Sequence, residues 1–435
     1  MAKTSYYGSP RISTGFPECP LPITFDTYKY CSFHCLYCLS DYNKCSNPSS
    51  KDIFEKGIVT SVNPEKVIKL FTGQYPNNPI YKYWIKKKKV IQWGGLAEPF
   101  DYFEEKRGVG YQLMKFFAEI EYPIRFCAKG TLPLKSKYRQ LLKDNAEKLK
   151  DKWFFLYTII TTDEEMSKKL ERGTPSPAER YKTLAFLKSL GYKTGHRLRP
   201  FIIGISDKTL DDMLKKDLEV DIDALCSEIY CVDVRATGLS REAYKQISKL
   251  VGYDVETYYK KCSVGNMGLL RLTPKIKEPY FLKMYEWCKK YGKIFASNDP
   301  HFKHLNTTYC CCGLPDDDSP LGNYSKFTTT SVIKYLHDKY MAGEKPTITW
   351  TEFVEKFGSD NIELLKAVCI ENPFFVDGYL NKHKLINLNL FDYLHNLWNN
   401  PKSKARGSLY FYYAGRIKPV GLDKKGDVIY QYFPK

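Results

Sequence analysis

Strand-like and helix-like stretches alternate along the first half of this chain. Short runs of aliphatic, β-branched and aromatic residues, typical of buried strands, are separated by segments whose apolar residues recur every three or four positions, typical of amphipathic helices. This order predicts parallel βαβ units with right-handed crossovers. The strand-like runs are Ile23–Tyr28, Lys89–Trp93, Ile124–Cys127, Trp153–Ile160, Lys193–Ile203 and Glu228–Val234; the helical ones are Pro64–Phe71, Gly110–Ile120, Lys135–Lys148, Pro177–Leu190 and Leu210–Leu218.

Six such units predict an α/β fold built on a partial (β/α)6 TIM-type barrel. We expect residues 1–240 to form this barrel with an extended lead-in, residues 241–325 to form a Cys-containing extension that caps it, and residues 326–435 to form a small α+β module. In that module the pattern predicts helices over Thr330–Tyr340 and Ile362–Cys369, and paired strands over Leu409–Tyr413 and Val428–Tyr432.

The composition narrows the setting in which the chain works. Its 435 residues carry a formal net charge of +18, which favours a polyanionic partner, with nucleic acid first. A generally lysine-rich composition would give the same charge. No apolar run reaches the length of a membrane span, and the first residues contain no apolar run of the kind found in a signal peptide. We therefore expect a cytoplasmic protein with no membrane partner. There the 14 cysteines stay reduced, and serve as metal ligands, catalysts or core residues.

Three cysteines stand close together in the run from Tyr30 to Cys38. Cys31, Cys35 and Cys38 are separated by three residues and then two. Three thiolates on one tight loop can hold three corners of a four-iron cluster and leave the fourth iron open for chemistry. A zinc site completed by His34 or Cys45 is the alternative.

The positions of these residues relative to the predicted strands favour the iron cluster. The cysteine loop follows the first strand, Gly94-Gly95 the second and Lys129 the third. The carboxyl ends of parallel strands meet at one edge of the sheet, which is where α/β folds place their chemistry. Two glycines there also let a small ligand approach the backbone closely.

These features and three further segments resemble one known family. Ile124–Pro133, Tyr157–Pro177 and Arg199–Asp207 occur in this order behind the cysteine loop. Together they look like the spore photoproduct lyase and DNA repair photolyase-like branch of the radical S-adenosylmethionine (SAM) superfamily. The similarity covers roughly residues 20–240.

The resemblance implies two cofactors and a set of residues that hold them. Cys31, Cys35 and Cys38 would ligate a 4Fe–4S cluster, whose open iron would bind SAM. Reductive cleavage of SAM would give a 5′-deoxyadenosyl radical, which would abstract hydrogen from the substrate. An electron donor such as flavodoxin or ferredoxin is implied as a partner. The residues expected at the SAM site are Tyr37, Gly94, Gly95, Glu98, Lys129, Thr161 and Arg199.

One departure leaves the target of the radical open. The lyase returns a hydrogen atom from a cysteine that follows its cluster loop, whereas this chain has no cysteine between Cys45 and Cys127. Weak candidates for a catalytic thiol are Cys127 and the run Cys310, Cys311 and Cys312. With Cys262 or Cys288, or with Asp299 and His301, that run is also a candidate second metal site, against the simpler prediction of a buried turn.

Three functions therefore compete. The first is a radical SAM enzyme that repairs or modifies a nucleic acid or nucleotide. The second is the same chemistry on a peptide or small molecule. The third is a zinc-containing nucleic-acid-binding protein without catalysis. Lys402, Lys404, Arg406, Arg416 and Lys418 interleave with aromatic residues near the carboxyl end, which suits a nucleic acid but equally an aromatic core with a solvated rim.

Overall fold

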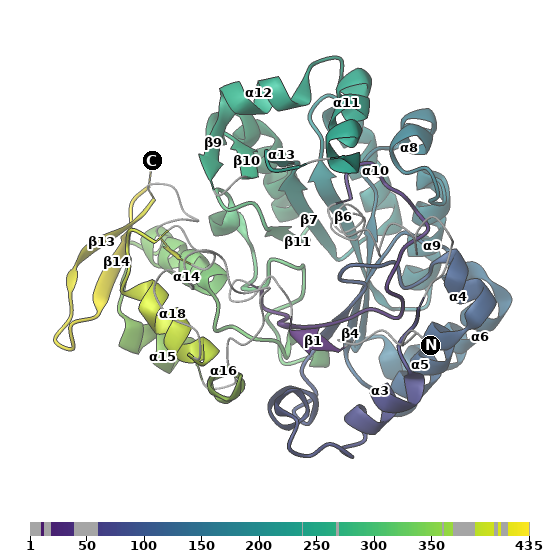
Figure 1. Ribbon diagram of the computed structural model, residues 1–435, viewed down its shortest axis with the longest axis horizontal. Helices are drawn as coiled ribbons and strands as arrows, with labels where there is room; N and C mark the ends of the chain where they lie inside the picture. Colours follow the sequence, from purple (N-terminus) through teal and green to yellow (C-terminus); the bar gives the residue numbers. More distant parts are fainter. Residues whose placement is uncertain are drawn as a thin grey trace.

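The computed structural model describes residues 10–12, 19–38, 60–236, 238–266, 269–358, 361–368, 388–403, 408–409 and 416–434. A large mixed α/β body carries a smaller unit that contains the last helices and strands of the chain (Figure 1). No helix within the described residues is both long and apolar enough to cross a membrane.

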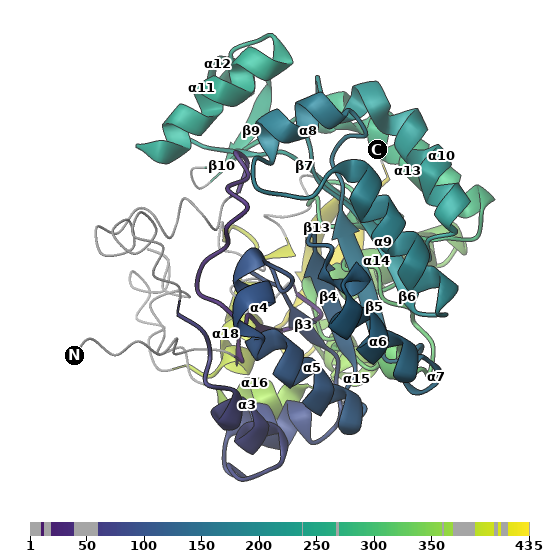
Figure 2. The same ribbon diagram turned by 90° about the vertical axis from the view of Figure 1, so that its right-hand side faces the viewer.

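One eight-stranded sheet organises the larger body. All neighbouring pairs are parallel except the first, where a two-residue strand runs antiparallel to the next. The sheet curves (Figures 1 and 2), and in the described residues its two edge strands do not pair with each other. The barrel is therefore open and partial. The predicted α/β partial barrel is confirmed. Its strands, in spatial order, are β1 (Arg11–Ile12), β2 (Ile23–Phe25), β3 (Ile91–Trp93), β4 (Ile124–Ala128), β5 (Trp153–Thr158), β6 (Lys193–Phe201), β7 (Ala224–Ile229) and β11 (Ile294–Ser297).

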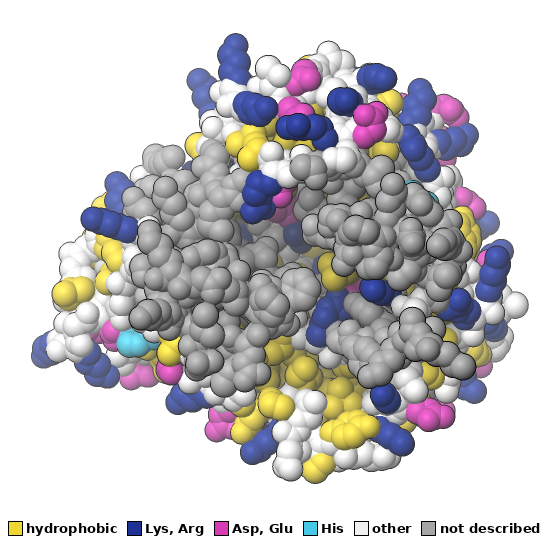
Figure 3. Space-filling model, viewed as in Figure 1, with side chains coloured by type: hydrophobic (Ala, Val, Ile, Leu, Met, Phe, Trp, Pro, Cys, Tyr) yellow, Lys and Arg dark blue, Asp and Glu magenta, His cyan; other side chains and the backbone are white. Residues whose placement is uncertain are grey.

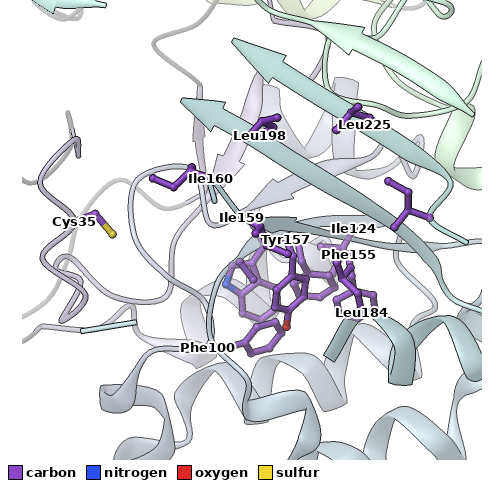
Figure 4. Packing of buried hydrophobic residues seen from close by; sticks show 14 of the residues in the cluster. Cys35, Phe100, Ile124, Phe155, Tyr157, Ile159, Ile160, Leu184, Leu198 and Leu225 are labelled. Carbon is purple, nitrogen blue, oxygen red and sulfur yellow. The ribbon is translucent and has the colours of Figure 1, made fainter. Parts of the chain in front are cut away.

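Helices cover the outer face of this sheet and bury its aromatic side chains. Phe126 stacks on Phe155 with ring centroids 4.8 Å apart, and Leu184 from an outer helix closes over the same cluster (Figure 4). Local signals fix the helix ends: Ser176 and Glu179 form a capping box in front of α9. The helices are α3 (Pro64–Phe71), α4 (Tyr102–Arg107), α5 (Val109–Glu119), α6 (Ser136–Asp144), α7 (Ala146–Leu149), α8 (Glu164–Leu170), α9 (Pro177–Ser189) and α10 (Leu210–Val220).

The sixth strand begins earlier than the sequence pattern predicts. The pattern predicts Glu228–Val234, whereas β7 spans Ala224–Ile229 and the chain then leaves the sheet. The small apolar residues at its start fit the crowded interior of the barrel and pair with β6 and β11. Val232–Asp233 forms β8, which belongs to a separate three-stranded sheet with β10 (Leu269–Leu272) and β9 (Ser263–Asn266).

The segment after residue 240 adds a seventh parallel strand to the barrel. Helices α11 (Leu239–Val251), α12 (Val255–Cys262) and α13 (Pro274–Lys290) precede β11, which is hydrogen-bonded to β7 in register Ala296 with Cys226. The chain then passes inside the barrel. Cys310, Leu314 and Tyr324 are buried with Phe154, Leu156 and Ala224 from the inner face of the sheet.

The last unit has its own hydrophobic core. Its strands form an antiparallel sheet in the order β12-β14-β13. The predicted strand Val428–Tyr432 is confirmed as β14, but its hairpin partner is β13 rather than Leu409–Tyr413; residues 410–413 lie outside the described residues. The elements are α14 (Thr329–Met341), β12 (Thr347–Ile348), α15 (Trp350–Phe357), α16 (Ile362–Ala367), α18 (Leu390–Trp398), β13 (Ile417–Leu422) and β14.

Candidate active site

The cysteine loop lies directly after β2, at the carboxyl ends of the parallel strands. Cys35 is buried, whereas Cys31 and Cys38 are half-buried. The backbone amide of Cys38 donates to the carbonyl of Cys35 (3.0 Å), so the two residues close a tight turn. The loop is therefore compact, with two of its three sulfur-bearing residues reaching solvent.

The Asp101 carboxylate, in the loop after β3, holds one side of this turn. Asp101 accepts hydrogen bonds from the backbone amide and the hydroxyl of Ser32, both at 2.7 Å. The same carboxylate caps α4 by accepting from the amide of Phe103 (3.0 Å). Asp101 thus ties the cysteine loop to the start of a helix of the barrel.

The end of α8 and the residues that follow it hold the other side of the cysteine loop. The amide of Leu36 donates to the carbonyl of Leu170 (2.8 Å), and the amide of Gly173 donates to the carbonyl of Phe33 (3.0 Å). A side chain at Gly173 would meet the Ser32 carbonyl oxygen at 2.5 Å, so only glycine allows this approach. The cysteine loop is therefore clamped between two rigid parts of the barrel.

A fully buried ion pair lies behind the clamp. Glu171 pairs with Arg180 of α9, with Oε2 and Nη1 2.7 Å apart, and Tyr37 donates its hydroxyl to the other carboxylate oxygen. Arg180 also donates to the carbonyls of Pro175 (2.8 Å) and Thr158 (3.0 Å). Sequence reasoning missed Asp101, Glu171 and Arg180. The run Glu171–Pro175 is part of a segment that resembles the family, but nothing in it indicates contact with a loop 134 residues earlier.

The charges around the three thiols suit a cationic ligand. Burial raises the pKa of Cys31 well above its ordinary value, and Asp101 and the other two cysteines raise it further. Burial also raises the pKa of Cys35 to about 12, although Lys129 opposes the shift. Metal ions bind the deprotonated thiolate, so a bound cluster would have to displace these protons. Three cysteines on one loop supply the sulfur ligands that a cluster takes, and in this respect the residues present fit it.

Two further residues could complete a zinc site with the three cysteines. His34 is exposed, and Cys45 lies outside the described residues. In the described part of the chain, no group of three or more His, Cys, Asp or Glu side chains is placed to hold one metal ion. Zinc needs its ligands around one point, whereas a four-iron cluster takes one thiolate at each corner. The cluster and the zinc alternative both stay predictions.

Tyr37 and Lys129 lie at the cysteine loop. The Lys129 ammonium is 5.6 Å from the centre of the Tyr37 ring. Burial alone would lower the pKa of Lys129, but the facing Cys35 thiol and Glu171 carboxylate raise it above its ordinary value. Lys129 therefore carries a fixed positive charge beside the cysteines.

Close packing explains why residues 94 and 95 are both glycine. Gly94 has a φ of 91°, and a side chain there would meet the Cys127 carbonyl oxygen at 2.4 Å. A side chain at Gly95 would meet the Thr24 hydroxyl at 2.2 Å. That hydroxyl is buried and has no hydrogen-bond partner among the described residues, so a polar ligand over Gly95 would satisfy it.

Glu98 joins the ends of β3 and β4. Its carboxylate accepts from the backbone amides of Lys129 (2.9 Å), Gly130 (3.1 Å) and Phe100 (3.1 Å). Burial raises its pKa to about 7, although Lys129 and these amides oppose the shift. Glu98 thus positions the Lys129 backbone, and much of its accepting capacity is already used.

Thr161 and Arg199 do not contact the cysteine loop. The Thr161 hydroxyl is 3.1 Å from that of Thr209 and accepts from the Asp163 amide. Arg199 forms an ion pair with Glu228 of β7 inside the barrel. Their expected role at SAM stays a prediction.

Two further arginines line the inside of the barrel beside Arg199. Arg125 on β4 donates to the Gln92 side chain (2.7 Å) and the Cys312 carbonyl (3.0 Å), and Arg197 on β6 donates to the Thr158 hydroxyl (3.2 Å). Neither has a described carboxylate within ion-pair distance. Burial lowers the pKa of Arg197, and the neighbouring Arg199 and Arg125 lower it further. The interior therefore holds more positive than negative side chains.

The remaining cysteine candidates lie within this interior. Cys127 is half-buried on β4, two residues from Arg125 on the same face. Cys310, Cys311 and Cys312 are buried in the segment inside the barrel, where they pack with Cys19. The neighbouring thiols and the Arg125 charge lower the pKa of Cys312 well below its ordinary value, although burial opposes the shift.

The second metal site expected at Cys310, Cys311 and Cys312 stays a prediction. None of the described His, Cys, Asp and Glu groups is arranged around an ion there. The Arg125 guanidinium lies beside this run and donates to the Cys312 carbonyl. Cys288 and the pair Asp299 and His301 bond elsewhere: Cys288 to the Ile294 carbonyl, and Asp299 and His301 to Lys277.

Comparison with known proteins found similar structures only. No protein-family profile matches the sequence, and no curated protein matches it. A spore photoproduct lyase mutant with bound AdoMet and dinucleoside spore photoproduct is 13% identical, with a TM-score of 0.48 over 67% of this chain and 80% of that one. SuiB of Streptococcus suis is 12% identical, with a TM-score of 0.39 over 66% of this chain and 51% of that one.

Methylornithine synthase is 14% identical, with a TM-score of 0.32 over 53% of this chain and 62% of that one. The similarity is low on every measure, and the chemistry of the site is decided by its own residues.

Proposed function

We propose that this protein is a radical SAM enzyme whose substrate is a nucleic acid or nucleotide. The observation that carries the proposal is the clamped cysteine loop, which holds three cysteines in one tight turn at the carboxyl ends of parallel strands. When bound, the reduced cluster supplies the electron that cleaves SAM into methionine and a radical able to abstract hydrogen.

The residues around the loop would hold and orient these cofactors. Cys31, Cys35 and Cys38 would ligate three irons. Lys129 offers a fixed charge for a carboxylate, and the unsatisfied Thr24 hydroxyl beside Gly95 offers a hydrogen bond. Glu171 and Asp101 hold the loop in place from opposite sides.

The barrel interior favours an anionic substrate. Arg125, Arg197 and Arg199 face inward with only Glu228 as a described ion-pair partner. A phosphate would balance this charge and match guanidinium geometry. The formal net charge of +18 agrees with a polyanion. A peptide or small molecule with a carboxylate is the second candidate, because it would satisfy the same arginines.

SAM cleavage tests this proposal. Protein reconstituted with iron and sulfide under anaerobic conditions is incubated with SAM and dithionite, or with flavodoxin or ferredoxin as electron donor, and 5′-deoxyadenosine is measured. We expect product from the wild type and from Cys262→Ala, a half-buried cysteine away from the loop, and none from Cys35→Ala. Wild-type protein that binds iron and forms no 5′-deoxyadenosine would contradict the proposal.

A further inference from the structure

The described elements of the unit at the carboxyl end follow the order of a winged helix–turn–helix. A helix (α14), a short strand (β12), two further helices (α15 and α18) and a hairpin (β13 and β14) follow in sequence, with α16 between the helices. The sheet order β12-β14-β13 places the first strand beside the last. This topology is used for duplex recognition by many helix–turn–helix proteins, where one helix and the hairpin project from a common core.

The hairpin and α18 form one rigid surface. Trp398 donates its indole N–H to the Val428 carbonyl (2.8 Å), and Tyr430 donates its hydroxyl to the Trp398 carbonyl (2.7 Å). His395 and Asp427 are 2.6 Å apart. Two rings of the core, Phe353 and Trp398, stack with centroids 5.4 Å apart. The hairpin therefore keeps its position relative to the helix.

The exposed part of the hairpin is basic. Lys418, Lys424 and Lys425 are exposed, and none pairs with a described carboxylate. Two acids lie in the same hairpin and are used by other partners: Asp423 accepts from the amides of Lys425 (2.8 Å) and Asp427 (3.0 Å), and the Asp427 carboxylate pairs with His395 and Asn399. Lys and Arg side chains are visible over the hairpin tip at the left edge of the molecule (Figure 3). Residues 326–435 contain 16 Lys and Arg against 11 Asp and Glu.

We infer that this unit binds double-stranded DNA through phosphate contacts made by the hairpin lysines. A hairpin with exposed ammonium groups suits the regularly spaced phosphates of a duplex, although Lys425 also donates to the Thr351 hydroxyl (3.2 Å) and the Lys418 ammonium lies 5.2 Å from the centre of the Phe433 ring. The exposed side of α18 offers Asp392 and Asn396 but no Lys or Arg, so the binding is expected to depend little on base sequence. The inference deepens the proposed function, on which it rests, by naming duplex DNA as the partner.

Binding is measured on the full chain without iron or SAM, with a fluorescent random-sequence DNA duplex over a range of salt concentrations. We expect affinity to fall steeply with salt. The variant Lys418→Glu/Lys424→Glu/Lys425→Glu should bind at least about ten times more weakly, with a salt slope reduced by about 0.9 for each phosphate that is no longer neutralised. The matched control, Lys86→Glu/Lys87→Glu/Lys115→Glu, changes the same charge at exposed barrel positions and should bind within about twofold of the wild type.

Several results would overturn the inference. Equal weakening in both triple variants would indicate attraction by net charge alone. Tighter binding to RNA of the same length, or to anionic vesicles through the exposed Val420 and Leu422, would name another partner. Thermal unfolding of each variant shows whether it folds. Because the assay needs no cluster, absence of SAM cleavage would defeat the proposed function and leave this inference standing, and absence of DNA binding would do the reverse.

Discussion

At the scale of single residues, the Glu171 carboxylate helps to hold the cysteine loop in position, a role that the residues around Glu171 in the sequence do not indicate. It is fully buried, and it balances the Arg180 charge while it accepts the Tyr37 hydroxyl. A buried charge that loses its partner is costly, because neither water nor another group replaces the interaction. Positioning of the loop thus depends on a residue that would ligate nothing itself.

Replacing this carboxylate should damage both stability and cluster binding. We expect Glu171→Gln to lower the free energy of unfolding by about 3–5 kcal/mol, because Arg180 stays charged and buried. The iron content after reconstitution should fall as the loop loosens. Glu165→Gln is the control: its pair with Lys168 is fully exposed and screened by solvent, so its loss should leave the stability nearly unchanged. Denaturant unfolding and iron analysis check both variants; equal behaviour of the two would contradict the assigned role.

A second residue-scale prediction concerns the segment inside the barrel. Gly313 has a φ of 81°, and a side chain there would meet the Cys226 sulfur at 2.7 Å. Gly343 has a φ of 74° but open space around it. We expect Gly343→Ala to cost about 1 kcal/mol from backbone strain alone, and Gly313→Ala about 1–3 kcal/mol more from overpacking. Thermal unfolding gives the comparison, and equal destabilisation would show that the segment does not pack against β7.

At the scale of elements, the pattern of apolar residues predicts most of the barrel strands and many of the helices. It does not predict which of these elements contact one another. Trp153–Thr158 is strongly apolar and forms β5, as predicted. The start of β7 was missed because Ala224 and Cys226 are small residues without a strong strand signal; their place depends on pairing with β6 and β11. The clamp on the cysteine loop joins segments far apart in sequence, which periodicity cannot reveal.

The contact between β6 and α10 gives a pH prediction. His196 Nδ1 lies 2.7 Å from Asp217 Oδ2, and Nε2 lies 2.7 Å from the Ile159 carbonyl oxygen. Both partners only accept, so the doubly protonated ring fits best. Burial alone would lower the pKa of His196, but Asp217 raises it above its ordinary value. The folded protein therefore binds this proton more tightly than the unfolded chain.

Stability from this pair is accordingly full below the unfolded pKa of about 6.5 and is lost as pH rises through the higher folded pKa. Urea unfolding between about pH 6 and 9 should show a declining free energy of unfolding for the wild type. The decline should be shallower in His196→Gln, which should also be less stable by about 3 kcal/mol at the acid end because Asp217 loses its cation. Identical slopes would contradict the protonated pair.

At the scale of the whole molecule, two hydrophobic cores meet along one chain. The barrel core and the core of the last unit share few residues, while polar contacts such as Lys303 with Thr330 (3.2 Å) join the two bodies. The sequence predicted the partial barrel and the cysteine loop because both have local signals. It did not predict the seventh strand, β11, or the arginine-lined interior, since these arise only when distant strands are assembled.

Because the two bodies have separate hydrophobic cores, a mutation in one core should destabilise that body and leave the other folded. Phe353→Ala should lower the stability of the last unit by about 3–5 kcal/mol and leave the absorption of the reconstituted cluster at about 420 nm intact. Phe155→Ala, the matched change in the barrel core, should reduce both barrel stability and cluster absorption. Calorimetry with absorption spectroscopy distinguishes the cases, and loss of the cluster in Phe353→Ala would show that the two bodies unfold as one.

The central claim is that Cys31, Cys35 and Cys38 hold a four-iron cluster with one iron open to SAM. Electron paramagnetic resonance of the reconstituted, dithionite-reduced protein tests it most directly, with iron and sulfide counted in the same sample. We expect about four irons and four sulfides per chain and a spectrum that changes when SAM is added. A colourless zinc protein, or a cluster whose spectrum is unchanged by SAM, would contradict it.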